Sequence, residues 1–163
     1  MKSRRVMFAS ALAFLLSAAW LPSVEPSSAA EDRGRLVSAR PVVLEIEPGR
    51  DLEPKFSDPN RVRTILKLIE DVYYGRPLQY PKDGTVFQNK EGRLPSKPKG
   101  FYREYTVMPP KGSPSRITVG DRVFNIQPAG GSRGAERLII GGGSLAYYSP
   151  DHYKTFIPLV VLR

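Results

Sequence analysis

The sequence contains no cysteine and a single histidine, His152, and these two scarcities limit how the protein is stabilised and what it can bind. Without disulfides, the fold has to be held by packing and hydrogen bonds. The acidic residues are scattered along the chain, so no cluster has the spacing of metal ligands. We therefore expect neither a metal nor a cofactor.

Long apolar runs are also missing, except at the N-terminus. There, basic residues precede an apolar run at 6–20, and the small residues 27–30 follow. The run is too short, and too soon followed by Pro22, to span a bilayer. This is the pattern of a secretory signal peptide over 1–30. We expect cleavage near Ala30, a secreted product, and no membrane association of the mature protein.

Acidic residues are fewer than basic ones, 16 against 25, which gives a net charge of +9. The first 30 residues hold three basic and one acidic side chain, so the remainder keeps 22 against 15, or +7. A surplus of this sign suits a polyanionic partner such as nucleic acid. Many exported proteins are basic without binding anything, so charge alone leaves the partner open.

The chain after the leader has room for one domain of ordinary size. Residues 31–57 are rich in Arg, Pro and Glu, and we treat them as an N-terminal extension of unknown role. An apolar piece at 41–46 could pair as an extra strand. The domain itself is expected to span 58–163.

A helix is predicted to open this domain. Asp58 has a side chain suited to an N-cap, Pro59 suits the first helical position, and Gly75 supplies a stop. Between them, apolar residues recur at steps of three and four: Val62, Ile65, Leu66, Ile69, Val72 and Tyr73. Such a stripe indicates a helix that packs on a sheet.

Short β-prone runs follow, separated by turns rich in Gly, Pro and Asp, such as 81–84, 109–112 and 129–131. The candidate strands are 85–88, 101–107, 116–126 in one or two pieces, 136–140, 146–148 and 153–161. A helix followed by strands predicts an α+β fold, with the N-terminal helix packed on a mostly antiparallel sheet.

The run 101–107 fixes a carboxylate in the middle of a strand. Because side chains alternate faces, Glu104 shares one face with Tyr102 and Thr106, while Tyr105 and Val107 point to the other. A solvated surface charge is the simpler explanation of Glu104. Whether Glu104 is a surface charge or a functional carboxylate depends on which residues lie beside it.

His152 and two arginines are the candidate partners. A lone histidine is usually structural, but beside a strand glutamate it forms a natural acid and base pair near neutral pH. Arg133 and Arg137 lie among glycines that allow a bend, so both guanidiniums could reach one anion, and their geometry matches phosphate. The alternative is a pair of surface arginines bound to Glu136.

Several stretches together resemble a known family. They are 83–91, 94–95, 102–107, Arg133 with Arg137, and 147–156. In order and spacing, over roughly 60–160, they resemble the guanyl-specific bacterial ribonucleases typified by barnase and the Streptomyces enzymes. The segment 111–131 is longer than the turn expected there. Its role is open, a longer hairpin over the active site being one option.

The resemblance implies the microbial ribonuclease fold and a metal-independent mechanism. Glu104 would be the general base that takes the proton from the ribose 2′-OH, and His152 the general acid that protonates the leaving 5′ oxygen. Arg133 and Arg137 would hold the phosphate and stabilise its growing charge. A 2′,3′-cyclic phosphate would form first, and water would then open it to a 3′-phosphate.

The guanine site implied by the resemblance is a loop and one aromatic residue: Phe87, Gln88, Asn89, Lys90, Glu91 and Tyr153. Guanine offers N–H donors at N1 and N2 that Glu91 can accept, and adenine lacks this pair. Phe87 and Tyr153 would stack on the base. A core position is the alternative for Phe87. Lys90 would be a solvent-facing cation near the phosphates.

The expected function is therefore a secreted, monomeric, guanyl-preferring endoribonuclease that cleaves single-stranded RNA 3′ of G. An acidic inhibitor of the barstar type would dock on the basic face around Arg133, Arg137 and Lys90. One alternative is a basic module that binds RNA without cutting it, which would need neither Glu104 nor His152. Another is a ribonuclease toxin against rival cells, which the leader and the lack of a large delivery domain disfavour.

Overall fold

The computed structural model describes residues 46–127 and 133–163. The predicted signal peptide, the first part of the extension with its apolar piece at 41–45, and the turn at 129–131 lie outside the described residues. The described residues contain no helix that is long and apolar enough to span a membrane.

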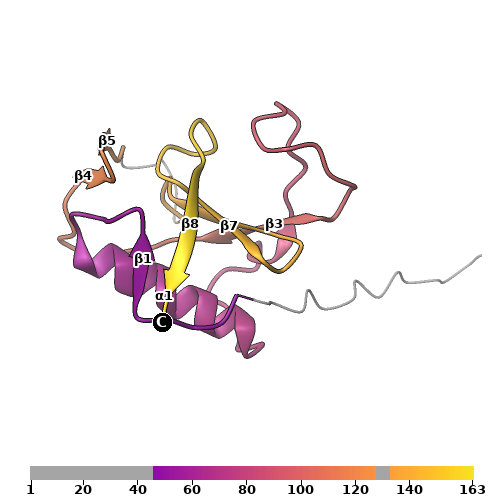
Figure 1. The fold of residues 1–163 in the computed structure, drawn as a ribbon, viewed down its shortest axis with the longest axis horizontal. Coiled ribbons are helices and arrows are strands. Elements are labelled where there is room, and N and C mark those ends of the chain that lie inside the picture. Colours follow the sequence, from indigo (N-terminus) through magenta and orange to yellow (C-terminus); the bar gives the residue numbers. More distant parts are fainter. Residues whose placement is uncertain (1–45, 128–132) are drawn as a thin grey trace, which may run out of the picture. The chain divides into compact units, whose positions relative to one another are not determined.

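Within the described residues, one helix and a six-stranded sheet make up most of the fold (Figure 1). In chain order the elements are β1 (Asp51–Glu53), α1 (Pro59–Tyr73), β2 (Thr85–Val86), β3 (Tyr102–Thr106), β4 (Arg116–Val119), β5 (Arg122–Asn125), β6 (Arg137–Gly141), β7 (Leu145–Ser149) and β8 (Ile157–Leu162). The large sheet has the order β1-β8-β7-β6-β3-β2, and β4 pairs with β5 in a separate hairpin. All of these pairs are antiparallel, which confirms the predicted α+β class.

The helix α1 begins and ends where the sequence predicts. The Asp58 side chain accepts a hydrogen bond from the backbone N–H of Asn60 at 3.0 Å, and Pro59 occupies the first turn. Gly75 follows the helix with φ +63°, a conformation that glycine adopts without steric cost. The two ends of the element are therefore set by local chemistry.

The apolar stripe of α1 is buried along most of its length. Ile65 and Ile69 are fully buried against the sheet. The prediction was wrong at Tyr73, which is 38% exposed, because in the last turn its ring packs edge-on against Tyr74, 5.0 Å away, and not into the core. A polar residue takes part instead, since Arg61 is also buried in the helix.

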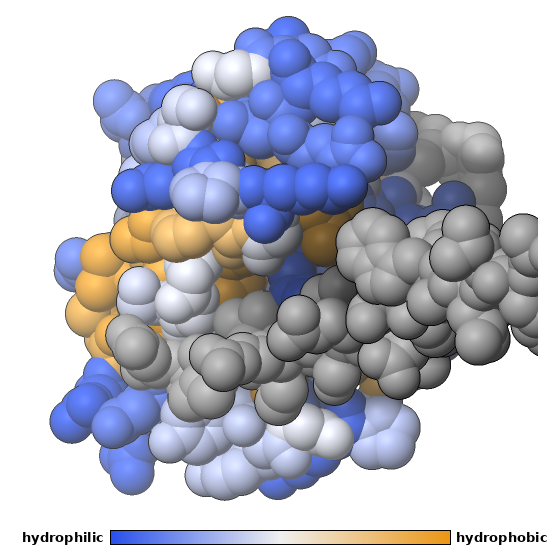
Figure 2. Space-filling model, turned by 90° about the vertical axis from the view of Figure 1, so that its right-hand side faces the viewer, coloured by the Kyte–Doolittle hydropathy of each residue, from blue (hydrophilic) through white to orange (hydrophobic). Residues whose placement is uncertain are grey.

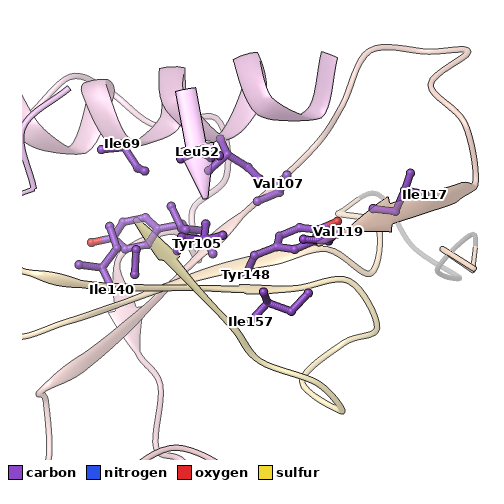
Figure 3. Close-up of a cluster of buried hydrophobic side chains, with 13 residues drawn as sticks. Leu52, Ile69, Tyr105, Val107, Ile117, Val119, Ile140, Tyr148 and Ile157 are labelled. Atoms are coloured by element: carbon purple, nitrogen blue, oxygen red, sulfur yellow. The ribbon is translucent and has the colours of Figure 1, made fainter. Parts of the chain in front are cut away.

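Two clusters of apolar side chains lie on opposite faces of the sheet. The main core lies between the sheet and α1 and includes Tyr105 and Val107 (Figure 3). The smaller cluster joins Tyr102 with Leu94 and Ile139. The predicted alternation along β3 is thus confirmed, and the face of Tyr102 and Glu104 points away from the helix.

The last strand starts later than predicted. Residues 153–156 are not part of a strand, and β8 begins at Ile157. The reason is a left-handed backbone at His152 (φ +55°) and Tyr153 (φ +70°), which interrupts any strand at this point.

Part of the N-terminal extension belongs to the fold. The strand β1 pairs with β8, and its central residue Leu52 is completely buried in the main core. This strand lies after the piece at 41–46 that the sequence singled out.

The inserted hairpin packs against the same extension. Phe56 forms an isolated bridge with Val119, and the backbone N–H of Ser57 donates to the carbonyl of Thr118 at 2.9 Å. Ile117 and Val119 are buried in the main core. The described part of the insertion therefore enlarges the core, and it contributes no residue to the pocket described below.

A buried charged cluster fastens the start of α1 to the residue before β6. Arg61 donates to both carboxylate oxygens of Glu136, at 2.7 Å (Nε) and 2.9 Å (Nη2), and both side chains are almost fully buried. Asp58 also accepts from Arg61, and Tyr148 donates to Glu136. Glu136 is thus the side-chain partner of Arg61, and the alternative that it pairs with Arg133 and Arg137 was wrong.

Electrostatics in this cluster favour the charged pair. Burial disfavours the positive charge of Arg61, but the hydrogen bond and charge of Glu136 outweigh it and raise the pKa of the guanidinium. Burial, reinforced by the nearby Glu136 carboxylate, raises the pKa of the Tyr148 hydroxyl. The hydroxyl therefore remains a donor to Glu136 at any ordinary pH.

We predict that Leu52→Ala destabilises the protein by about 2–5 kcal/mol, because it leaves a cavity in the main core. Urea unfolding of the two proteins measures the difference. The control is Val160→Thr on the adjacent strand, where the side chain is 58% exposed, so the change should stay within about 0.5 kcal/mol. An unchanged unfolding midpoint for Leu52→Ala would show that β1 is not part of the stable fold.

We predict that Arg61→Met costs about 3–5 kcal/mol of unfolding free energy, since it leaves the Glu136 carboxylate buried without its cation. Adding Glu136→Gln should recover part of this loss, because the second change removes the uncompensated charge. Lys67→Met is the matched control: its partner is Asp71 and its side chain is 69% exposed, so its loss should be at most about 1 kcal/mol. Equal losses at positions 61 and 67 would contradict a structural role for the buried pair.

Candidate active site

One pocket of about 550 Å³ brings together the predicted acid, base and base-reading loop. Its lining includes Phe87, Gln88, Asn89, Lys90, Glu91, Glu104, His152 and Tyr153. These residues come from the loop after β2, from β3, and from the loop between β7 and β8. Val86, Arg93 and Lys154 also line the pocket and were not predicted.

The loop after β2 is shaped by the side chain of Asn89. Its Nδ2 donates to the carbonyl of Leu94 at 2.8 Å, and its Oδ1 accepts from the N–H of Leu94 at 3.0 Å. Asn89 has φ +48°, and the N–H of Gly92 donates to its carbonyl at 2.9 Å. Because this amide is engaged inside the loop, Gln88, Lys90 and Glu91 are left as the exposed side chains of the segment.

Phe87 lies beside the pocket and belongs to the smaller apolar cluster. Its ring stacks on Tyr153 with centroids 5.2 Å apart and an interplanar angle of 25°, and it packs at a tilt against Phe156. The two aromatic residues that were expected to stack on a base thus contact each other. The half-buried position of Phe87 agrees with the alternative of a core side chain.

Glu104 is held from two sides. Its Oε2 accepts a hydrogen bond from the hydroxyl of Tyr153 at 2.7 Å, and its Oε1 lies 3.6 Å from Nη2 of Arg133. Burial, followed by the hydrogen bond to Glu104, raises the pKa of Tyr153 to about 12. The hydroxyl therefore stays protonated at neutral pH and donates to the carboxylate.

Arg137 is fixed by an unusually complete set of backbone partners. Its Nη1 donates to the carbonyls of Arg133, Gly134 and Glu136 at 3.1, 2.9 and 2.8 Å, and its Nε donates to the Tyr153 hydroxyl at 3.0 Å. The residue is only 4% exposed. Its Nη2 has no hydrogen-bond partner in the part of the chain that the structure describes, so this amino group is left for an anion.

Arg133 is positioned by a threonine and a buried carboxylate. Its Nε donates to Oγ1 of Thr106 at 2.9 Å, and its Nη2 lies 3.4 Å from Oδ1 of Asp83. That Asp83 oxygen also accepts from the N–H and the hydroxyl of Thr106 at 2.8 and 2.7 Å. Across 46–127 and 133–163 no partner is found for Nη1 of Arg133.

Asp83 is a site residue that the sequence analysis missed. It was assigned to a turn and to the stretch 83–91 that resembles the ribonucleases, but it was given no role in the site, because Asp before Gly84 is a common turn signal. Its position 23 residues before Thr106 carries no local pattern that would connect the two. Arg133 and Arg137 contact Glu104 and Tyr153 respectively, but neither arginine lines the pocket itself.

His152 is exposed at the edge of the pocket on a strained loop. Left-handed backbone at residues other than glycine costs of order 1–3 kcal/mol each and persists only when other contacts hold it. Here the N–H of His152 donates to the Ala135 carbonyl at 3.1 Å, and the N–H of Tyr153 donates to Oγ of Ser149 at 2.9 Å. These bonds fix the backbone of His152 while its imidazole remains open to solvent.

The two loops that carry these residues are joined across the pocket. Nη1 of Arg93 donates to the carbonyl of Lys154 at 2.6 Å. Lys90 and Lys154 add positive charge to the lining, and Glu91 and Glu104 are its acidic residues. Over the described residues, no group of three or more His, Cys, Asp or Glu side chains could hold a metal ion.

The arrangement suits proton transfer next to an anion. A carboxylate and an imidazole line one pocket. Beside it, each of the two guanidiniums has one terminal nitrogen without a partner among the described residues. A general base, a general acid and fixed cations are what the cleavage of a phosphodiester needs when the nucleophile is supplied by the substrate.

Comparisons with known proteins agree with this chemistry. A family model described as ribonuclease matches residues 58–159. Guanyl-specific ribonuclease St of Saccharopolyspora erythraea is 38% identical over 106 residues, which are 65% of this chain and 78% of that protein. Guanyl-specific ribonuclease Sa3 of Kitasatospora aureofaciens is 39% identical over 99 residues, or 60% of this chain and 55% of that protein. A solved structure of ribonuclease Sa2 in complexes with mononucleotides covers 59% of this chain and 81% of its own, with 32% identity and a TM-score of 0.44.

The family match covers more than half of the chain and includes every residue of the pocket. The chain also spans most of the length of its relative St. It therefore belongs to the family of microbial guanyl-specific ribonucleases.

Proposed function

We propose that the protein is an endoribonuclease that cleaves single-stranded RNA on the 3′ side of guanosine, without a metal ion. The observation that carries this proposal is the meeting of Glu104 and His152 with the whole loop 87–91 in one pocket. A pocket that only gripped RNA would need neither an acid nor a base at this place.

In the first step Glu104 takes the proton from the 2′-OH of the bound guanosine. The 2′ oxygen attacks phosphorus, the bond from phosphorus to the 5′ oxygen of the next nucleotide breaks, and His152 gives that oxygen a proton. The products are a 2′,3′-cyclic phosphate and a free 5′-OH. The hydrogen bond from Tyr153 and the nearby Arg133 hold Glu104 in place for this transfer.

The cations stabilise the charge that grows on the phosphate. Nη1 of Arg133 and Nη2 of Arg137 have no partner among the residues described, whereas the other nitrogens of both side chains are bound to protein. Donors that are already fixed need no reorganisation as the transition state forms. The backbone carbonyls that hold Arg137 therefore contribute to the rate of cleavage as well as to the stability of the fold.

In the second step water opens the cyclic phosphate. The water oxygen attacks phosphorus as His152 takes a proton from it, the bond from phosphorus to the 2′ oxygen breaks, and Glu104 returns a proton to the 2′ oxygen. The product is a 3′-phosphate. The exposure of His152 suits this exchange with solvent.

Recognition of the base is assigned to the loop after β2. Glu91 is exposed in the pocket and can accept the two N–H groups of guanine, and backbone N–H groups of the loop can donate to O6. The internal amide bonds of Asn89 give the loop a fixed shape, so these groups are placed before the base arrives.

We also propose that the protein is exported, acts as a monomer, and is inhibited by an acidic protein of the barstar type. The N-terminal pattern of a signal peptide supports export. The basic residues Lys90, Arg133 and Arg137, which lie in or beside the pocket, support fast and salt-sensitive binding of an acidic partner.

The function is tested by incubating the protein with defined oligoribonucleotides in EDTA and identifying the ends of the products. We expect cleavage after G, with a 2′,3′-cyclic phosphate that becomes a 3′-phosphate. His152→Gln should slow this cleavage by ~10²–10⁴-fold, as is typical for the loss of one acid–base group. No cleavage by the unaltered protein, or cleavage only after a metal is added, would end the proposal.

A comparison of two carboxylates separates base reading from chemistry. Glu91→Ala should reduce kcat/KM on GpA much more than on ApA, because it removes hydrogen bonds that only guanine can make. Glu104→Ala should slow both dinucleotides by a similar factor, since the 2′-OH is the same in each. The measurement is kcat/KM on both substrates, after circular dichroism has shown that both variants are folded. The opposite pattern would mean that the two roles are exchanged.

A further inference from the structure

A second pocket of about 380 Å³ shares a wall with the first. Both pockets are lined by Phe87, Gln88 and Asn89. The remaining residues of the second pocket are Ser96, Lys97, Pro98, Lys99 and Tyr102. The proposed reaction uses none of these five residues.

The second pocket is polar and positively charged. It has two lysines and no acidic residue in its lining. Within the described ranges, neither Lys97 nor Lys99 has a carboxylate within 4.0 Å, and Nζ of Lys97 lies 5.3 Å from the centre of the Phe101 ring. The upper part of the surface is hydrophilic in Figure 2. In Figure 1, the loop after β2 projects on this upper side of the molecule. The lysines are therefore free to bind an anion.

The face of β3 gives the direction in which RNA would reach this pocket. Tyr102, Glu104 and Thr106 lie in this order on one face of the strand. Thr106 holds Arg133, so the scissile phosphate belongs on the Thr106 side of Glu104. Tyr102, which lines the second pocket, lies on the opposite side.

A nucleoside carries its 3′ and 5′ oxygens on different sides of the sugar. With the 3′ phosphate of guanosine at Arg133, the strand on its 5′ side leads away from Arg133. We propose that the second pocket binds the nucleotide on the 5′ side of the guanosine, with Lys97 and Lys99 contacting the phosphates of that strand. Lysine ammonium groups commonly bind phosphates in this way. This inference rests on the proposed function, because it takes the guanosine to occupy the first pocket.

The pocket on the other side of the site has the wrong charge for the same role. It is lined by Asp71, Asp83 and Lys67, and its lysine is bound to Asp71 at 2.6 Å. Carboxylates repel the phosphates of a strand. Of the two pockets, the one lined by Tyr102 and the two unpaired lysines is therefore the one suited to bind the phosphates of the strand.

The experiment uses short oligonucleotides in which the guanosine lacks its 2′-OH and so cannot be cleaved. The probes are (dG)pA, UpUp(dG)pA and (dG)pApUpU, which compare extension on the 5′ side with an equal extension on the 3′ side. Dissociation constants are measured by calorimetry over a range of salt concentrations. We expect Lys97→Gln/Lys99→Gln to remove most of the affinity gained by 5′ extension, and to leave the gain from 3′ extension.

Salt dependence adds a readout that a folding defect would not mimic. For single strands, the slope of log affinity against log salt changes by about 0.7 for each phosphate contact. The double variant should therefore flatten the slope for UpUp(dG)pA by about 0.7 or more. The matched control, Lys55→Gln/Lys111→Gln, removes the same charge from exposed positions outside both pockets and should keep the slope.

Two outcomes would overturn the proposal. One is equal binding of (dG)pA and UpUp(dG)pA by the unaltered protein, and the other is an equal loss in the control variant. Cleavage of GpA by the unaltered protein is measured in parallel. If GpA is cleaved and 5′ extension adds nothing, only the second pocket is refuted, whereas a failure to cleave GpA refutes the proposed function itself.

Discussion

The buried ion pair between Arg61 and Glu136 is the interaction on which the rest of the structure depends. It connects the first turn of α1 with the residue that immediately precedes β6, and the two residues are 75 positions apart in the chain. The backbone of Glu136 is used as well, since its carbonyl accepts from the N–H of Val107 and from Nη1 of Arg137. A buried pair of this kind contributes little net stability compared with apolar packing, but it fixes one geometry because any other leaves a charge unpaired.

From that fixed point a continuous series of hydrogen bonds runs to the carboxylate of Glu104. The carbonyls of Glu136, Gly134 and Arg133 accept from Arg137. Arg137 in turn donates to Tyr153, and Tyr153 donates to Glu104. Arg133 reaches the same carboxylate from the side of Thr106. Glu104, the proposed general base, is thus oriented by protein groups from β3, β6 and the loop before β8, before any substrate binds. Preorganised polar groups of this kind are the main source of electrostatic stabilisation in enzymes.

The sequence predicted the parts that local chemistry controls. Capping residues and apolar periodicity predicted α1, and the alternation along β3 predicted the face on which Glu104 lies. The motif pattern predicted that His152 lies in the same pocket as Glu104. What it missed depends on distant contacts. In the sequence, Arg61 has the pattern of a surface residue, and only the fold brings Glu136 to it. Asp83 likewise has the pattern of a turn residue, and only the fold brings Thr106 to it. The late start of β8 follows from the left-handed backbone of His152 and Tyr153. Hydrogen bonds to Ala135 and Ser149, which lie outside the predicted strand, hold that conformation in place.

The contact between the N-terminal extension and the inserted hairpin has a consequence for the exposed strand edges of the domain. Residues 55–57 cover the open side of β4, and β1 covers the open side of β8. An uncovered strand edge is a template for pairing with another molecule. A chain cut back to the limits of the family match, 58–159, would expose both edges at once. Within this chain, the extension therefore pairs the outer edge of the inserted hairpin as well as the outer edge of the main sheet.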